Sequence, residues 1–360
     1  MSDYELDLDE IQSILNKELG DGVAEVEVVD ELPTDTVAVS TTEWSEHPDL
    51  EGVETRITDA GKLFGDVGLL GQPVKQYRGL EALSTITVPT PIDPYEINTE
   101  MIRALCIASV TGLKPLFVGD TGSGKTSGIE QFAALTGRPF HRQEFDEFTD
   151  DQKLFGSLEM RAGGETYFNK SDLTKSISIP AIVCCDEIFA ATSGTQMALN
   201  PLTDRRQIRV TSHDESVSET INAHPEWMVT FTDNTAGNGD GLDIYNTRST
   251  SDQAMNNRID MFVHVPYPSE SAERRLITAL APDLDIHEVR RLAKFSQECH
   301  KAFESRDITC GFSVRNLRAI LGMISQHLTV KEAIGLNFIN RVAKSEQSDV
   351  NTLVRSIWGE

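Results

Sequence analysis

The segment "LFVGDTGSGKTSGIEQ", from Leu116 to Gln131, joins a short apolar run to a glycine-rich turn and a lysine–threonine pair. The turn fits the pattern G-x-x-x-x-G-K-[ST], in which backbone N–H groups and a helix N-terminus surround the phosphates of a nucleotide. In this pattern Lys125 reaches the β- and γ-phosphates, and the Thr126 hydroxyl is offered to Mg²⁺. The residues expected to bind the nucleotide are Gly119, Asp120, Thr121, Gly122, Ser123, Gly124, Lys125, Thr126 and Ser127.

A pair of carboxylates follows the apolar stretch "AIVCC", which is typical of a buried strand. The end of this strand would place Asp186 and Glu187 at the carboxyl edge of a sheet, beside the phosphates. Asp186 can hold Mg²⁺ through water, and Glu187 can polarise an attacking water as general base. Because a kinase would place an acceptor where this base lies, the pair favours hydrolysis and predicts that the nucleotide drives motion. The two thiols of the strand, Cys184 and Cys185, are expected to be buried and inert.

Two more polar side chains are candidates for the same site. Asn234 follows a third apolar strand, "WMVTFT", and a neutral amide there is suited to sensing the γ-phosphate and orienting the water. Arg315 lies in the first turn of a candidate helix that begins at Ser313. Taken alone, Arg315 would be interpreted as a solvated helix arginine, because most arginines are exposed.

The elements that would position these side chains alternate between strands and helices. Apolar strands are expected at residues 116–118, near 140, and at 181–185, 227–232 and 261–265, with helices from about residue 98 and over 126–135. This alternation predicts an α/β fold with a parallel sheet sandwiched by helices. The stretch "GSLEMRAGGETYFNK" predicts a hairpin, and the pattern is wholly helical after "PYPSES". We expect an N-terminal segment over 1–75, an α/β nucleotide-binding domain over 76–267 and a small all-α domain over 268–360.

The net charge of −25 is distributed unevenly along the chain. Residues 1–75 carry 19 acidic against 4 basic side chains. Beyond one helix candidate at residues 6–19, this segment has little to bury, so it is either partly disordered or a docking segment for a partner. Nucleic-acid binding draws on clustered Lys and Arg, so the charge makes nucleic acid an improbable ligand and favours a protein partner.

Composition also bears on the expected cellular location of the protein. No apolar run approaches the roughly 20 residues that cross a bilayer, and the acidic opening "MSDYELDLDE" differs from a signal peptide. We therefore expect no membrane association and a cytoplasmic protein. The five cysteines form no C-x-x-C pair, which argues against a disulfide framework and a structural zinc site.

The ordered motifs GDTGSGKT, VCCDE, TFTDN, NNRID and GFSVR, followed by a helical region, resemble those of the AAA+ ATPases. Within that family the chain is most similar to the MoxR-like branch and, within the branch, to CobS, the ATPase subunit of aerobic cobaltochelatase. The likeness covers residues 89–322. It includes "IDPYEINTEM", the run "DNTAGNGDG", and Tyr245, Thr247 and Gln253 ahead of Arg258.

The resemblance implies a P-loop AAA+ core with a small all-α lid, ATP and Mg²⁺ as ligands, and a homo-oligomeric ring that is usually hexameric. In such a ring Arg258 would be the arginine finger inserted into the neighbour's site, with Arg205 and Arg206 as rivals for this role. Asn257 stands where the family usually has an acidic residue before the finger. Arg315 would be the sensor arginine of the lid, and the hairpin near 162–168 would face the centre of the ring or the partner.

The resemblance further implies an ATPase that remodels or activates a protein partner, often one with a von Willebrand A-type domain. Two alternatives remain open, the ATPase subunit of a metal chelatase and a nucleic-acid-directed motor. A nucleotide-gated scaffold that assembles without hydrolysis is disfavoured by the Asp186–Glu187 pair.

Overall fold

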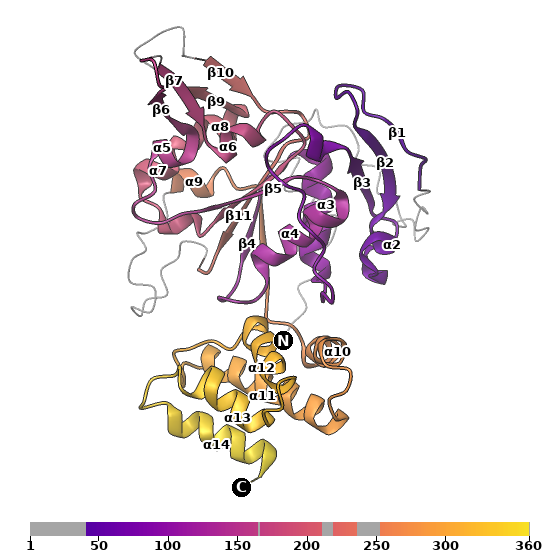
Figure 1. Ribbon diagram of the computed structural model, residues 1–360, viewed down its shortest axis with the longest axis vertical. Coiled ribbons are helices and arrows are strands. Elements are labelled where there is room, and N and C mark those ends of the chain that lie inside the picture. Colours follow the sequence, from indigo (N-terminus) through magenta and orange to yellow (C-terminus); the bar gives the residue numbers. More distant parts are fainter. Residues whose placement is uncertain (1–40, 165, 211–218, 236–252, 360) are drawn as a thin grey trace, which may run out of the picture. The chain divides into compact units, whose positions relative to one another are not determined.

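The computed structural model describes residues 41–164, 166–210, 219–235 and 253–359, which form an α/β region and a helical region (Figure 1). The candidate helix at residues 6–19, Tyr245 and Thr247 lie outside the described residues. Among the described helices, none is both long and apolar enough to cross a membrane.

A five-stranded parallel sheet forms the centre of the α/β region, with its strands in the order β12-β4-β11-β8-β5. The strands are β4 (Pro115–Val118), β5 (Phe140–Glu144), β8 (Ile182–Asp186), β11 (Met228–Asp233) and β12 (Met261–His264). All five coincide with strands expected from the sequence, and the parallel pairing confirms the expected fold class. Since parallel strands all end on the same side, the residues that follow β4, β8 and β11 meet at one edge.

Helices cover both faces of this sheet, and alternate residues of β8 face the two resulting cores. Ile182 and Cys184 belong to one core and Val183 and Cys185 to the other. The first core is closed by α3 (Thr99–Thr111) and α4 (Lys125–Thr136), and the second by α5 (Asp151–Phe155), α6 (Asp172–Ser176), α7 (Ser193–Ala198) and α8 (Asn200–Arg205). Cys184 and Cys185 are both buried, as expected, and burial raises the pKa of each thiol, which is consistent with their being inert.

The helical region that follows has its own apolar core. Its helices are α10 (Glu270–Leu280), α11 (Ile286–Glu304), α12 (Val314–Ile324), α13 (Val330–Ile334) and α14 (Gln347–Trp358), with a π-helical turn at Gly335–Ile339. Phe295, Phe312 and Phe338 pack edge to face at its centre, with ring centroids 5.0 to 6.3 Å apart. Because this core is formed by residues of the helical region alone, the region is the all-α unit expected from the sequence.

Two hairpins and a three-stranded sheet extend the α/β region. The expected hairpin is present as β6 (Gly156–Met160) and β7 (Thr166–Lys170), and a second, unexpected one pairs β9 (Gln207–Val210) with β10 (Glu219–Asn222). The antiparallel sheet β1-β2-β3 consists of β1 (Ser45–Glu46), β2 (Glu54–Asp59) and β3 (Pro73–Arg78), with α2 (Ala60–Phe64) after β2. The boundary expected after residue 75 therefore falls inside β3.

This three-stranded sheet packs on the α/β core. Phe64 stacks on Phe132 of α4 with ring centroids 5.6 Å apart, and Val74 of β3 is buried in the same core. β2 and β3 have only a few apolar residues among polar ones and β1 has none, which is why the sequence pattern alone indicated little to bury. Residues 44–78 are thus folded, and of the expected N-terminal segment the stretch before residue 41 lies outside the described residues.

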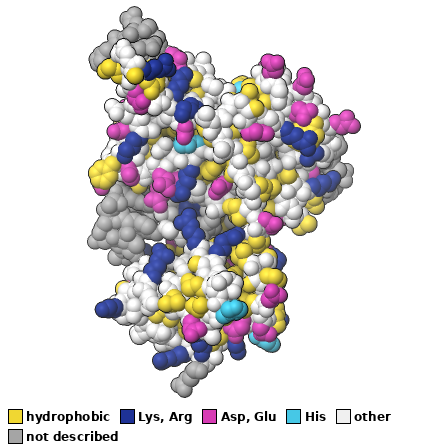
Figure 2. All heavy atoms as spheres, in the orientation of Figure 1, with side chains coloured by type: hydrophobic (Ala, Val, Ile, Leu, Met, Phe, Trp, Pro, Cys, Tyr) yellow, Lys and Arg dark blue, Asp and Glu magenta, His cyan; other side chains and the backbone are white. Residues whose placement is uncertain are grey.

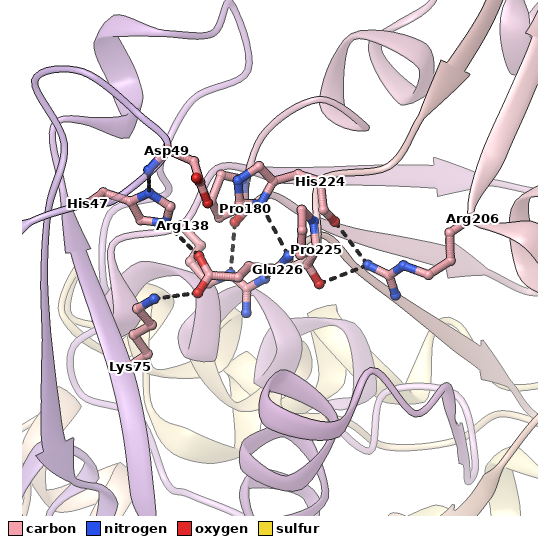
Figure 3. A network of polar contacts seen from close by, with 9 residues as sticks. All are labelled: His47, Asp49, Lys75, Arg138, Pro180, Arg206, His224, Pro225 and Glu226. Carbon is pink, nitrogen blue, oxygen red and sulfur yellow. Dashed lines mark hydrogen bonds and ion pairs between the residues drawn. The ribbon is translucent and has the colours of Figure 1, made fainter.

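A polar network ties the three-stranded sheet to the turn that precedes β11 (Figure 3). The Glu226 carboxylate accepts a hydrogen bond from His47 Nε2 at 2.8 Å and forms an ion pair with Lys75 of β3. Arg138, which is almost completely buried, donates to the Pro180 carbonyl at 2.8 Å and to the Glu226 carbonyl. A buried guanidinium without acceptors would lower the stability of the fold. The bond from Arg138 to the Glu226 carbonyl therefore stabilises the position of the turn before β11.

His47, His224 and Glu226 lie close enough to be considered as metal ligands. However, His47 Nδ1 accepts the Asp49 N–H at 3.1 Å, and His224 Nδ1 accepts the Glu226 N–H at 3.1 Å. A neutral imidazole that accepts at Nδ1 carries its proton on Nε2 and has no lone pair there for a metal. The hydrogen bonds, together with the Lys75 ammonium, therefore favour a structural tie.

A buried carboxyl group in the helical region links its stability to pH. Glu273 of α10 accepts hydrogen bonds from Ser296 Oγ at 2.6 Å and Gln297 Nε2 at 2.8 Å. Burial raises the pKa of Glu273 to about 7, so the folded protein binds its proton more tightly than the unfolded chain does. Its contribution to stability therefore falls as pH rises from about 4.5 to about 7 and is constant above that. Burial lowers the pKa of the neighbouring His300 to about 4, an effect of opposite slope.

We predict that Glu273→Gln stabilises the protein relative to wild type by an amount that grows from pH 4.5 to pH 7, reaching on the order of 2 kcal/mol. Comparing variant with wild type at each pH removes the contributions of groups that do not contact residue 273, and the difference includes the coupling to His300, whose Nε2 lies 3.9 Å from Glu273 Oε1. The measurement is the difference in Tm across this range, with the exposed Glu304→Gln as a control for net charge. A Tm difference independent of pH would contradict the prediction.

Candidate functional site

The glycine-rich turn connects β4 to α4, and α4 begins at Lys125 with Gly124 as its N-cap. Gly122 and Gly124 have positive φ angles of 86° and 98°, which glycine adopts without the penalty that a side chain would bring. Ser123 Oγ is buried in the turn and hydrogen-bonds to none of the described groups. A turn of this form in front of a helix N-terminus is suited to holding an anion, and the unsatisfied hydroxyl is a donor for it.

The ammonium group of Lys125 is buried and folded onto the turn. It donates to the Gly119 carbonyl at 2.5 Å, the Asp120 carbonyl at 3.0 Å and Asn234 Oδ1 at 2.9 Å. Burial lowers the pKa of Lys125, and the carboxylates around it, first that of Asp186, oppose this shift. Three acceptors thus hold the Lys125 side chain against the turn at the start of α4.

The carboxylate of Asp186, the last residue of β8, is buried and saturated with donors. Its Oδ1 accepts from Thr126 Oγ1 at 3.0 Å and from Thr232 Oγ1. Its Oδ2 accepts from Arg142 Nε at 2.7 Å, and the same guanidinium contacts it through Nη2. A carboxylate beside the hydroxyl of Thr126, at a helix N-terminus, is a donor set suited to a hard divalent cation such as Mg²⁺.

Glu187 and Asn234 lie side by side next to this pair. Glu187 has a left-handed backbone, with φ 57°, and its N–H is 3.3 Å from Thr232 Oγ1. The Asn234 amide donates to Glu187 Oε1 at 3.4 Å while its oxygen accepts from Lys125. A non-glycine residue in this conformation is strained, and such strain is most often kept where a side chain must point in a particular direction.

These groups line a cavity of about 300 Å³. Seven of the nine expected nucleotide-binding residues line it, from Thr121 to Ser127, whereas Gly119 and Asp120 contribute carbonyls that hold Lys125. Asp186, Glu187, Asn234 and Arg315 line it as well. On the face shown in Figure 2, basic side chains lie together where the α/β and helical regions adjoin. The structure therefore brings the sequence motifs together around one space of a size suited to a small ligand.

The helical region closes this cavity through close contacts with the glycine-rich turn. A Cβ atom on Gly122 would lie 2.4 Å from Ser313 Cβ, so only glycine fits there without displacement. Tyr267 donates its hydroxyl proton to the Thr121 carbonyl at 3.1 Å and stacks on His300 with ring centroids 3.9 Å apart. The geometry of the turn therefore depends on the position of the helices.

Comparison with known proteins agrees with this geometry. Residues 115–247 match the family described as AAA domain (dynein-related subfamily). This part of the chain is therefore similar to AAA domains. It contains the glycine-rich turn, Asp186, Glu187 and Asn234, and it ends before Arg258 and the helical region.

Three relatives match a part of the chain. Protein NorQ of Paracoccus denitrificans is 32% identical over 34% of this chain and 44% of its own length. Protein CbbQ of Hydrogenophilus thermoluteolus is 29% identical over 32% of this chain and 42% of its own length. The denitrification regulatory protein NirQ of Pseudomonas aeruginosa is 29% identical over 38% of this chain and 50% of its own length. The chain thus spans half or less of the relatives that it matches.

The three arginines considered as a finger differ in their surroundings. Arg258 does not line the cavity but makes a two-point ion pair with Asp204 of α8, at 2.8 and 3.0 Å. Arg205, beside Asp204, is exposed. Arg206 donates to three carbonyls, among them that of Trp227 at 2.7 Å, so its guanidinium is engaged in holding the backbone of the AAA domain.

Among the residues of the site that the sequence analysis did not single out are Arg142, Thr232, Tyr267 and Arg318. Arg318 donates to the Pro94 carbonyl at 2.8 Å and lines the cavity one turn after Arg315. Thr232 belongs to the "TFTDN" motif. A polar residue in an otherwise apolar buried strand needs a hydrogen-bond partner, and this signal could have identified it as a site residue. Nothing near Arg142 in the sequence marks it, since its partner Asp186 is 44 residues away.

We predict that Gly122→Ala weakens nucleotide binding by about tenfold or more, because the new Cβ meets Ser313 and the backbone is strained at positive φ. Titration with a fluorescent ATP analogue would measure this. The control is Gly322→Ala on the exposed side of α12, where the added methyl meets no atom within 4 Å and should stabilise the helix. Unchanged affinity in Gly122→Ala would show that the contact between turn and helices is dispensable.

Proposed function

We propose that this protein is a Mg²⁺-dependent ATP hydrolase of the MoxR-like type, which forms a ring and uses hydrolysis to remodel or activate a protein partner. The observation that carries the proposal is the meeting of Lys125, Asp186 and Glu187 in one cavity of an AAA domain, at the N-terminus of α4. A phosphate-binding turn alone would fit a switch or a kinase as well. The glutamate beside the cation ligand favours water as the acceptor.

Each residue has a task in such a hydrolysis. The Glu187 carboxylate would accept the proton of the attacking water, and the Asn234 amide, which donates to Glu187, would orient both. The Lys125 ammonium would balance the charge on the β- and γ-phosphate oxygens, and Arg315 would approach from the helical side. Mg²⁺, held by the Thr126 hydroxyl and the Asp186 carboxylate, would supply further charge neutralisation between the phosphates.

Assembly into a ring, usually a hexamer in the family that the chain resembles, would complete the site from a second copy. Arg258 is the side chain proposed to act across the interface, because it lies outside the cavity of its own chain. The ion pair with Asp204 holds its guanidinium in a defined place on α8. An arginine inserted from a neighbour stabilises the charge that develops during phosphoryl transfer.

The partner is proposed to be a protein. The net charge of −25 opposes the counterion release on which nucleic-acid binding depends. One relative is named as a regulatory protein, which fits an activity directed at another protein. The resemblance to the MoxR-like branch suggests a partner with a von Willebrand A-type domain, and a chelatase would be one such assembly.

We predict that Glu187→Gln binds ATP with nearly unchanged affinity but releases phosphate at least about 100-fold more slowly, because the general base is lost. Lys125→Ala should fail to bind ATP. Nucleotide affinity and phosphate release would be measured on the same preparations. Wild-type turnover in Glu187→Gln would remove the general-base assignment, and ATP binding in Lys125→Ala would remove that of the phosphate contact.

We predict that Arg258→Ala lowers turnover by about 10³-fold while leaving ATP affinity of the isolated chain unchanged. Wild-type specific activity should fall on dilution, since each site needs a neighbour. Asp204→Asn separates a structural role from a catalytic one, because it breaks the ion pair but keeps the arginine, and it should retain most activity. If Arg205→Ala rather than Arg258→Ala lost turnover, the finger would be Arg205. Specific activity independent of dilution would exclude a shared site.

A further inference from the structure

All acceptor positions of the Asp186 carboxylate are occupied by donors of the chain itself. Two hydroxyls share Oδ1, and the Arg142 guanidinium holds Oδ2 through two nitrogens. A carboxylate oxygen offers about two lone-pair sites, so this one has none left for a ligand. A cation that uses Oδ2, directly or through water, must displace Arg142 or share the oxygen with it.

Arg142 also has a second anionic partner within reach. Its Nη2 lies 2.7 Å from Glu144 Oε1, two residues further along β5. Residues two apart on a strand point to the same face, so the side chains of Arg142 and Glu144 lie next to each other. The two carboxylates differ in environment, because the side chain of Asp186 is 7% exposed and that of Glu144 is 71% exposed. The guanidinium thus bridges a buried anion and a solvated one.

We propose that Arg142 is a positioning residue that sets the affinity of Asp186 for Mg²⁺ by exchanging between Asp186 and Glu144. The proposal rests on the proposed function, since it concerns the cation of the same site. When Arg142 pairs with Asp186, its positive charge and its two N–H groups compete with Mg²⁺. When Arg142 pairs with Glu144 alone, Oδ2 is available and the local negative charge is higher. Glu144 keeps the guanidinium close, so that it can return when the cation leaves.

The exchange predicts effects of opposite sign for the two partners. Arg142→Gln removes the competitor, so the divalent cation should bind about three- to tenfold more tightly, the range expected for a partly exposed, charge-assisted contact. Glu144→Gln removes the alternative anchor, so Arg142 stays on Asp186 and the cation should bind more weakly. A merely structural role of Arg142 would weaken binding in both variants. In the double variant Arg142→Gln/Glu144→Gln, the loss of Glu144 should have little further effect, because it acts through the arginine.

The experiment titrates Mn²⁺ into the full chain in the presence of a saturating non-hydrolysable ATP analogue and follows free Mn²⁺ by electron paramagnetic resonance. This measures cation affinity without turnover. Arg142→Lys is a second variant that keeps the charge but loses the two-point geometry, and its Mn²⁺ affinity should lie between those of wild type and Arg142→Gln. Arg209→Gln, an exposed arginine on β9 that does not line the cavity, is the control for removing one positive charge.

Tighter Mn²⁺ binding in Arg142→Gln and weaker binding in Glu144→Gln, with Arg209→Gln like wild type, would support the proposal. Unchanged or weaker Mn²⁺ binding in Arg142→Gln, with the analogue still bound, would overturn it while leaving the proposed ATPase intact. If Arg209→Gln shifted the affinity equally, net charge alone would be responsible and the proposal would also fall. Failure of wild type to bind the analogue would instead overturn the proposed function.

Discussion

The buried carboxylate of Asp186 needs hydrogen-bond and ion-pair donors, and the arrangement of the site depends on this requirement. A charge withdrawn from water must be matched by donors, and those of Asp186 come from β5, the start of α4 and β11. These segments are separate in sequence but adjacent in the parallel sheet, where β8 lies between β5 and β11. The topology of the sheet therefore sets the electrostatics of the cavity, because the neighbours of β8 supply the partners of its last residue.

A second constraint is the narrow space between the glycine-rich turn and the helical region. Gly122 meets Ser313, and the Thr121 carbonyl accepts the hydroxyl proton of Tyr267, whose ring stacks on His300. The His300 Nε2 atom lies 3.0 Å from the Phe312 carbonyl, directly before α12. The turn is thereby in contact with the residues that lead into α12, the helix that carries Arg315. The same contacts explain why the cavity has walls from both regions.

The three-stranded sheet at the beginning of the described chain supports the site from behind. Gln76 of β3 donates to the Leu135 carbonyl of α4, the helix whose N-terminus faces the cavity, and the Glu226 network anchors the sheet to the turn before β11. Arg138, two residues after α4, is buried and donates to the Glu226 carbonyl of that turn and to the Pro180 carbonyl before β8. Two of the elements that position Lys125 and Asn234 are therefore held from outside the AAA domain as its family match delimits it.

The sequence by itself determined the elements whose signal is local. The five strands were predicted because each is a short apolar run, and the turn at residues 119–126 because its glycines and lysine must be adjacent in the chain to surround a phosphate. The β6–β7 hairpin was predicted from its turn residues. These features follow from neighbouring residues alone. The nearness of Lys125, Asp186 and Asn234 required one further assumption, that the strands before them form a parallel sheet.

Only the tertiary structure decided which distant side chains pair and which segments fold together. Arg142 on Asp186, Arg258 on Asp204 and Arg206 on backbone carbonyls leave no local pattern, because each partner is brought close by the sheet order rather than by spacing. The expected N-terminal segment over 1–75 has few apolar side chains in sequence, but its described part folds because most of those that are buried pack against α3 and α4. The residues needed to bind a phosphate can thus be identified in the sequence. Which side chains pair with them depends on which strands become neighbours in the sheet.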